Sequence, residues 1–181
     1  MVDVGGKPET ARSAVAAADV VMQPATLVLC QAGGAANPKG DVIATARLAG
    51  IAALKRTSEL IPLCHPVRVV GCEVDLVCDP ALPGIRVQVA VHAFDRTGVE
   101  MEAMVGATAA ALTIYDMVKG VDRGVTITAV RLLEKNGGRS GRWRAPELGK
   151  TPSVAVTVKG SARRKGAPRR FPNARPRRRP A

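Results

Sequence analysis

The 181-residue sequence predicts an α+β fold, and three observations predict it. Two long segments carry helical periodicity, three shorter segments alternate apolar and polar residues, and a short turn joins two of those three. Periods of 3.6 and 2 residues distinguish helices from strands. Strands joined by tight turns favour an antiparallel sheet, and the apolar sides of the helices must be buried against one of its faces.

The first helix is predicted over residues 40 to 55. Pro38 and Gly40 suit the entry of the chain into a helix. Its apolar residues recur close to the helical period: Val42, Ile43, Ala46, Leu48 and Ile51. Residues 57 to 66 (TSELIPLCHP) are then predicted to pass from a short helical turn into a loop, because two prolines forbid a continuing helix.

Two antiparallel strands follow, at residues 67 to 78 and 85 to 94, and the link DPALPG between them supplies turn chemistry. Residues 98 to 120 are rich in Ala, Met and Leu and predict a helix of about five turns. A further strand is predicted at residues 125 to 133. The specific architecture that we predict is a ferredoxin-like sandwich, with helices packed on one face of a mainly antiparallel sheet.

The net charge of +12 lies in one part of the chain. Residues 142 to 181 hold 13 Lys or Arg against one acid, whereas residues 1 to 141 hold 14 residues of each sign. We therefore divide the chain into a neutral domain, residues 1 to 143, and a basic tail, residues 144 to 181. The tail is expected to be disordered, because its composition buries too little apolar surface to offset chain entropy. Residues 153 to 160 are an exception, since their alternation resembles a short strand.

The tail allows two interpretations. Lys and Arg gain affinity for a phosphate backbone by displacing counterions, which would suit nucleic acid or polyphosphate. The alternative is a solvated tail without a specific role. Phe171 is the only aromatic residue of the tail, and Trp143 directly precedes the tail. The stacking platform of single-strand binders is therefore missing. Nucleic acid is therefore not the expected partner.

The sequence shows neither the spacing of a metal site nor a targeting segment. There are two histidines, which disfavours a His-rich metal site. No apolar run is clearly a membrane span, and no secretory signal is evident, so a cytoplasmic protein without a membrane partner is expected. The cysteines lack C-x-x-C spacing and are interpreted as reduced thiols, mostly in the core: Cys30, Cys64, Cys72 and Cys78.

Polar residues in otherwise apolar segments are the candidates for chemistry. Asp116 and Lys119, in the stretch ALTIYDMVKG, share one face of the long helix near its end. They could form an ordinary surface ion pair, for which a lysine near a helix C-terminus is well placed. They could also be a catalytic couple, in which either both pKa values are shifted or the lysine acts as a charged clamp. Burial in a cleft would decide between these. The neighbouring Tyr115 is interpreted as packing.

Glu100 and Glu102 open the same helix, where free backbone N–H groups and the positive helix end stabilise carboxylates. A helix rises about 1.5 Å per residue, so Glu102 and Asp116 would be separated by roughly 21 Å. Both could contact one small substrate only if the site joined two subunits or the ligand were long.

Two further residues are weaker candidates. His65 sits in a loop framed by prolines, and its ordinary pKa of about 6.5 suits proton transfer or phosphate contact, although a lone loop histidine is more often merely exposed. Lys39, at a predicted helix entry, could join free backbone amides in holding a phosphate. The PKGD spacing around it is not a Walker loop.

Taken together, these motifs resemble a known family. MVDVGGKPETAR (1 to 12), KGDVIATARLAGIAALKRTSELIPLCHP (39 to 66), GVEMEA (98 to 103), ALTIYDMVK (111 to 119) and GGRSGRW (137 to 143) are similar to the molybdenum cofactor biosynthesis protein C family, the cyclic pyranopterin monophosphate synthases. The resemblance covers nearly all of residues 1 to 143. It begins with the methionine of the first motif, so the first strand is expected to be incomplete.

The resemblance implies an enzyme of the phosphorus–oxygen lyase type. It would convert 3′,8-cyclo-7,8-dihydro-GTP, a nucleotide made by a radical iron–sulfur enzyme, to cyclic pyranopterin monophosphate with release of pyrophosphate. It implies a ferredoxin-like subunit in a homohexamer, a trimer of dimers, with sites at subunit interfaces. It also implies that no redox cofactor is needed, and it leaves open whether Mg²⁺ accompanies the triphosphate.

The resemblance also implies roles for individual residues. Asp116 would be the catalytic acid or base, and Lys119 its partner. The positions that contact substrate would be Leu63, Cys64, His65, Met101 and Glu102. Further polar positions around the same pocket would be Lys39, Glu100, Arg12 and Asp3.

The alternatives come from other classes of protein. A ferredoxin-like core could present its sheet to nucleic acid, but the predicted strands offer only Phe94 for stacking. An assembled protein could instead bind the small molecule without turnover. The presence of both Asp116 and Lys119 argues against a protein that only binds the small molecule.

Overall fold

A computed structural model describes residues 1–34 and 36–146 of the chain. Met1–Pro146 forms one compact unit. Its main strands are β1 (Thr10–Val21), β2 (Val69–Asp79), β3 (Gly84–Asp95) and β4 (Thr126–Asn136), and a two-residue strand, β5 (Trp143–Arg144), follows them. The helices are α1 (Pro24–Gln31), α2 (Val42–Leu54), α3 (Thr57–Leu60) and α4 (Glu100–Val118).

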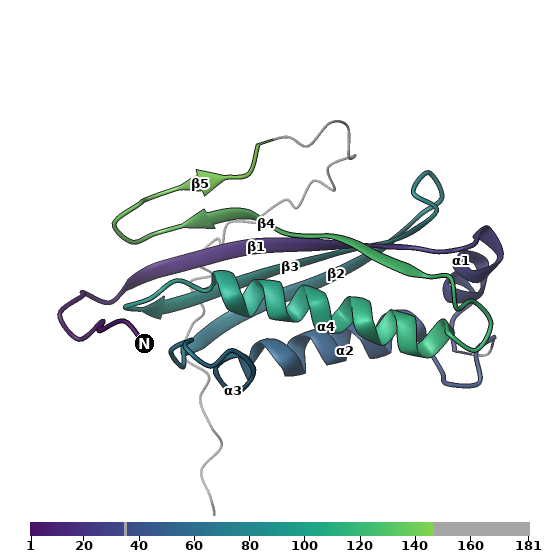
Figure 1. Cartoon of the computed structure of the whole chain (residues 1–181), viewed down its shortest axis with the longest axis horizontal. Coiled ribbons are helices and arrows are strands. Elements are labelled where there is room, and N and C mark those ends of the chain that lie inside the picture. The colour runs from purple at the N-terminus through teal and green to yellow at the C-terminus, as the bar shows by residue number, and fades with distance from the viewer. Residues whose placement is uncertain (35, 147–181) are drawn as a thin grey trace, which may run out of the picture. The chain divides into compact units, whose positions relative to one another are not determined.

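All neighbouring strands in the sheet are antiparallel, in the order β2-β3-β1-β4-β5. The chain runs β1, helices, β2, β3, α4, β4, which is the β-α-β-β-α-β order of a ferredoxin-like fold. Helices α2 and α4 lie side by side on one face of this sheet (Figure 1). The predicted α+β, ferredoxin-like sandwich is therefore confirmed.

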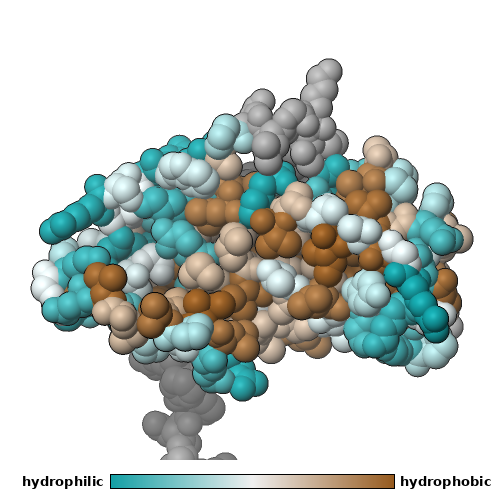
Figure 2. Space-filling view, in the orientation of Figure 1, coloured by the Kyte–Doolittle hydropathy of each residue, from teal (hydrophilic) through white to brown (hydrophobic). Residues whose placement is uncertain are grey.

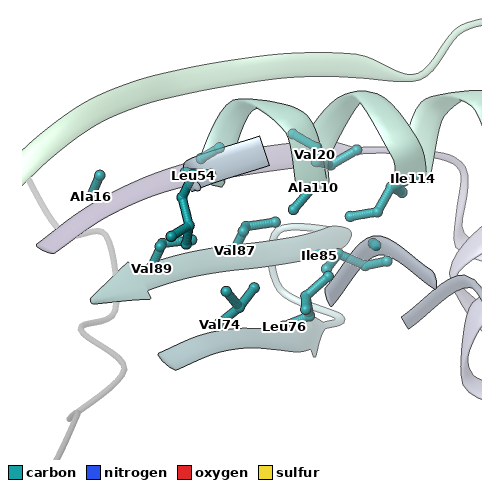
Figure 3. Packing of buried hydrophobic residues seen from close by; sticks show 14 of the residues in the cluster. Ala16, Val20, Leu54, Val74, Leu76, Ile85, Val87, Val89, Ala110 and Ile114 are labelled. Atoms are coloured by element: carbon teal, nitrogen blue, oxygen red, sulfur yellow. The ribbon is translucent and has the colours of Figure 1, made fainter. Parts of the chain in front are cut away.

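The core lies between the sheet and this pair of helices. Alternate residues of β1 and β3, such as Val20, Val87 and Val89, point toward the helices and are almost completely buried. Ala110 and Ile114 of α4 meet them from the other side (Figure 3). The period of 2 in the strands and the small, apolar inner face of α4 thus bury the same layer from both sides.

Helices α2 and α4 approach each other at two glycines. A Cβ atom placed on Gly50 would lie 3.1 Å from the carbonyl oxygen of Gly106, and one placed on Gly106 would lie 3.2 Å from the side chain of Val89. Backbone meets backbone at this crossing because neither helix has a side chain there. The crossing fixes how α4 lies across the sheet, and hence where both of its ends lie.

The two helices and three strands predicted from periodicity are confirmed as α2, α4, β2, β3 and β4, with small shifts at their ends, but periodicity did not predict β1, α1 or the two-residue β5. β1 is rich in alanine, which has a weak tendency to form strands, and α1 is a short helix with proline at its first turn. The expectation of an incomplete first strand is wrong. All twelve residues of β1 pair with β3, and β1 also pairs with β4, so it is a central strand.

The sheet includes the residues at the boundary between the predicted domain and the predicted basic tail. Trp143 and Arg144 pair with β4, and both Arg142 and Arg144 form ion pairs with Glu134. The remainder of the predicted tail from residue 147, including the strand-like stretch at 153 to 160, lies outside the described residues.

Other features agree with the sequence. The four cysteines are free thiols; Cys30 is buried, and Cys72 and Cys78 pack partly buried against the core. Tyr115 also packs against the core, as interpreted. Within residues 1–34 and 36–146, no helix is both long enough and apolar enough to span a membrane.

Candidate functional site

The C-terminal end of α4 carries a carboxylate between two ammonium groups. Lys39 Nζ lies 2.8 Å from Asp116 Oδ2, and Lys119 Nζ lies 2.7 Å from Asp116 Oδ1. Lys39 Nζ also donates to the backbone carbonyl of Asp116, at 2.7 Å. The structure thus brings together three residues that the sequence analysis singled out, two from α4 and one from the loop before α2, and gives the cluster a net charge of +1.

This cluster is charged in its resting state. Hydrogen bonds from Lys119 and Lys39 lower the pKa of Asp116 to about 2, and the same bond to Asp116 raises the pKa of Lys119. About half of each of the three side chains is exposed. A single chain therefore does not bury the couple in a cleft, and near neutral pH it presents two cations and one anion.

The predicted role of Lys39 in holding a phosphate stays a prediction, and the entry of α2 beside it already carries a carboxylate. Asp41 is the N-cap of α2, and its side chain accepts a hydrogen bond from the backbone N–H of Ala44 at 2.9 Å. A carboxylate already occupies the helix end, and it would repel a phosphate there. Lys39 instead reaches across to α4.

The N-terminal end of α4 has the opposite character. Glu102 is 2% exposed, and its Oε2 has no hydrogen-bond partner among the described residues. Burial raises the pKa of this carboxyl, and the nearby acids Glu100 and Asp95 raise it further. The pKa of the Cys64 thiol is also raised, first by burial and then by the charge of Glu102.

A set of hydrogen bonds gathers several segments around this end of α4. Arg12 of β1 donates to the backbone carbonyls of Asp95 and Arg96 in the connection between β3 and α4. The backbone N–H of Arg68, just after the proline-framed loop, donates to Asp95, and Arg96 donates to the carbonyl of Gly5. The loop, the start of β1 and the N-terminal segment are thereby held to Asp95 and Arg96, just before α4.

The other predicted residues belong to the N-terminal end. Leu63 is 71% exposed and adjoins Cys64, His65 is half-buried, and Met101 is 38% exposed. Glu100 lies in the first turn of α4 beside Glu102. Asp3 lies in the N-terminal segment, where its side chain accepts from the backbone N–H of Gly5. The predicted residues thus form two groups at opposite ends of α4.

The separation between these groups agrees with the estimate from the sequence. α4 is a continuous helix of 19 residues, and Figure 1 shows α3 and the N-terminus at one end and α1 at the other. Fourteen residues of helix separate Glu102 from Asp116, which is roughly 21 Å. The structure does not bring them together within one subunit.

Asn37 is a residue of the cationic end that the sequence analysis missed. It is 6% exposed, and its amide bonds both to the loop that carries Lys39 and to the end of α4. An asparagine before a proline indicates a surface turn, so no sequence signal marked it as buried.

Within the described residues, no group of three His, Cys, Asp or Glu side chains is placed to hold a metal ion.

The two ends suit different parts of a ligand. Two ammonium groups around an exposed carboxylate can bind and stabilise phosphate oxygens. A buried carboxyl with an unpaired oxygen requires a hydrogen-bonding partner, because an unsatisfied buried polar group is costly. Such a group can form a hydrogen bond with a polar group of a ligand.

Comparisons with known proteins relate this chain to one family. The model of the MoaC family matches residues 1–138. A cyclic pyranopterin monophosphate synthase of Geobacter sulfurreducens is 55% identical over 147 residues, covering 81% of this chain and 91% of the relative. Synthases of the same name from Brucella ovis and Methylobacterium nodulans are each 56% identical, over 79% and 80% of this chain and 86% and 89% of the relatives.

Proposed function

The chain belongs to the MoaC family, and from this we infer that it is an enzyme of molybdenum cofactor biosynthesis that converts 3′,8-cyclo-7,8-dihydro-GTP to cyclic pyranopterin monophosphate and pyrophosphate. The observation that carries the proposal is the identity of 55 to 56% over most of the chain with relatives that bear this synthase name. The reaction is a lyase reaction at a phosphorus–oxygen bond.

The cationic end of α4 fits the phosphate part of this reaction. A hydroxyl oxygen of the substrate bonds to the α-phosphorus, and the bond from that phosphorus to the pyrophosphate oxygen breaks. Lys39 and Lys119 are placed to stabilise the negative charge on the leaving pyrophosphate. Asp116 holds both ammonium groups, and it becomes a proton acceptor when a phosphate draws the lysines away from it.

The buried end fits the base. Rebuilding the ring system of the nucleotide requires several proton transfers, which are efficient only when the base is held in one orientation. The unpartnered Oε2 of Glu102 can accept an N–H of the base, and Cys64 and Arg12 lie at the same end of α4. In this proposal Glu102 orients the base, while the lysines act on the phosphates.

Both ends can serve one substrate molecule if the site is shared between subunits. A two-fold axis that crosses α4 midway between Glu102 and Asp116 would bring the acidic end of one subunit to the cationic end of its mate. Large apolar side chains stand exposed on the outer faces of the helices, with Leu48 at 68% and Leu112 at 55%. Figure 2 shows apolar residues spread over the face that carries α2 and α4. Such a face is suited to subunit contact.

The assembly that we propose is a homohexamer, a trimer of dimers, with one such shared site for each subunit. Contact with a second subunit would bury the cationic cluster that a single chain leaves half exposed. Burial strengthens each electrostatic interaction in the site, because water no longer screens it. The cleft that a catalytic couple requires would then be formed by two subunits, although one subunit alone leaves the couple exposed.

We propose that the reaction needs no resident cofactor, since the substrate is rearranged without net oxidation or reduction. Both oxygens of Asp116 are bonded to lysines, which leaves that carboxylate unsuited to hold a metal ion by itself. Any Mg²⁺ would arrive with the triphosphate. The substrate must be supplied by a radical iron–sulfur enzyme, and because that substrate is made from GTP, the cytoplasm is the compartment in which we place the protein.

The decisive experiment is incubation of the purified full-length protein with 3′,8-cyclo-7,8-dihydro-GTP. Equal amounts of pyrophosphate and cyclic pyranopterin monophosphate are expected, with and without EDTA. A protein that binds the nucleotide without releasing pyrophosphate would contradict the proposal and favour a binding protein. An inert core together with salt-sensitive binding of nucleic acid, lost on deletion of residues 147 to 181, would favour the nucleic-acid alternative.

A further inference from the structure

The C-terminal end of α4 is closed by side chains from a distant loop. The last carbonyls of a helix lack partners within the helix and must find them elsewhere. In α4, the carbonyls of Tyr115 and Val118 accept from backbone N–H groups just beyond the helix. The carbonyl of Asp116 accepts instead from Lys39 Nζ, and that of Met117 accepts from Asn37 Nδ2 at 3.1 Å.

Asn37 uses both halves of its amide in this arrangement. While Nδ2 donates to α4, Oδ1 accepts from the backbone N–H of Lys39 at 2.9 Å. The backbone carbonyl of Asn37 also accepts from the N–H of Gly40, which closes the turn around Lys39. One buried side chain therefore ties the backbone of Lys39 directly to the turn of α4 that carries Asp116.

We propose that Asn37 is a positioning residue of the cationic end, which acts by fixing the ammonium group of Lys39 against Asp116. This inference rests on the proposed function for its kinetic consequence, but not for its structural one. A lysine side chain has a flexible four-carbon stem, so the position of its charge depends on how its backbone is anchored. The amide of Asn37 supplies that anchor, because it joins Lys39, which is 2 residues away, to Met117, which is 80 residues away along the chain.

The chemistry of the site selects an amide. A carboxylate at position 37 could accept from Lys39 N but could not donate to the Met117 carbonyl, and the two oxygens would repel each other. An apolar residue would leave both the carbonyl and the N–H of Lys39 without partners in a buried place. Among side chains of this size, only asparagine offers the donor and the acceptor together.

The first test is a titration that does not depend on activity. In the wild-type protein, the Asp116 carboxylate should remain ionised as the pH falls from 7 to 3, observed by carbon NMR of the side-chain carboxyl. In Lys39→Ala its protonation should begin at a higher pH, because one cation is lost. The proposal expects Asn37→Ala to show the same upward shift as Lys39→Ala.

Thr26→Val is the matched control. Thr26 is also buried near the cationic end, where its hydroxyl donates to Asp122 at 3.1 Å, but it forms no hydrogen bond with Lys39 among the described residues. This variant should lose stability and leave the Asp116 titration unchanged. If the Asn37 variants behave like Thr26→Val, Asn37 is only structural and the proposal is overturned. If Asn37→Ala does not fold, Asn37→Ser, which adds no charge beside Asp116, gives the same comparison.

The second test is a double-mutant cycle on turnover. A misplaced catalytic group can cost about 10²-fold in rate, so a fall of up to that size in kcat is expected for Asn37→Ala. In the Lys39→Ala background the same change should have little further effect, because Asn37 acts through Lys39. Equal losses in the two backgrounds would overturn the proposal. If the protein has no synthase activity, the titration still decides the role of Asn37.

Discussion

The two ends of α4 present carboxylates of opposite kinds. Asp116 is half exposed, bonded to two lysines and strongly acidic, with a pKa of about 2. Glu102, at the other end of the same helix, is 2% exposed, has an oxygen without a partner among the described residues and has a raised pKa. One helix thus carries an ion-paired anion at its C-terminal end and a buried carboxyl with a raised pKa at its N-terminal end.

The difference shows how position in the fold overrides local sequence. A carboxylate near a helix N-terminus is normally stabilised in its charged form, and one near a C-terminus is normally destabilised. Here desolvation outweighs the helix end at Glu102, while two ammonium groups outweigh it at Asp116. In the proposed function, this contrast suits one end to phosphates and the other to a neutral, hydrogen-bonding base.

Removal of Lys119 from the cationic end should cause the largest loss of turnover. Lys119→Ala should lower kcat by about 10²-fold to 10³-fold or more, because a group that stabilises developing charge is lost. Pyrophosphate release from the cyclised nucleotide measures it. Arg56→Ala is a matched control, since Arg56 and Glu59 form another exposed i,i+3 ion pair at 2.7 Å, and it should keep wild-type turnover. Unchanged turnover in Lys119→Ala would refute the catalytic role.

Mixing two inactive variants tests whether the two ends meet across subunits. Glu102→Ala and Asp116→Ala should each lose turnover, and a mixture that is dissociated and reassembled should regain activity. In a shared two-fold site, random pairing restores about a quarter of the sites. No recovery, with mixed assemblies demonstrated by mass spectrometry, would mean that both ends act within one subunit.

The helix crossing at Gly50 tests the frame that both ends share. Gly50→Ala should lower the free energy of unfolding by about 1–3 kcal/mol, because the added methyl group would crowd the carbonyl of Gly106. Denaturant unfolding at fixed protein concentration measures the change. Gly71→Ala is the control, since a Cβ there meets no atom within 4 Å. Equal effects of the two substitutions would show that the crossing is not tightly packed.

The smallest expected effect is a pH dependence that arises from Glu102. A folded-state pKa above the unfolded value of about 4.5 means that the folded protein retains a proton which the unfolded chain releases. Stability should therefore fall as the pH rises from about 4.5 through the raised pKa. Glu102→Gln should lack this fall and gain stability relative to the wild type as the pH rises. Parallel stability curves between pH 4 and pH 8 would show that the pKa of Glu102 is not raised.

The sequence by itself determined most of the architecture. The period of 2 at β2 and β3 and the apolar spacing of α2 and α4 are local signals, because each element buries one side against the same layer. β1 and α1 were not predicted, because an alanine-rich strand and an eight-residue helix have weak local signals. Both take their stability from the neighbours on which they pack. The length of α4 also allowed the separation of Glu102 from Asp116 to be estimated before the fold was known.

Only the tertiary structure decided how the polar residues are paired. Lys39 and Asp116 are 77 residues apart in the chain, and no local pattern predicts that they form an ion pair. Asn37 has the sequence of a surface turn, yet it is buried because the end of α4 needs a donor. Burial and partnering depend on which segments meet, so they set the pKa values of Glu102 and Asp116, while the sequence set only which residues were available.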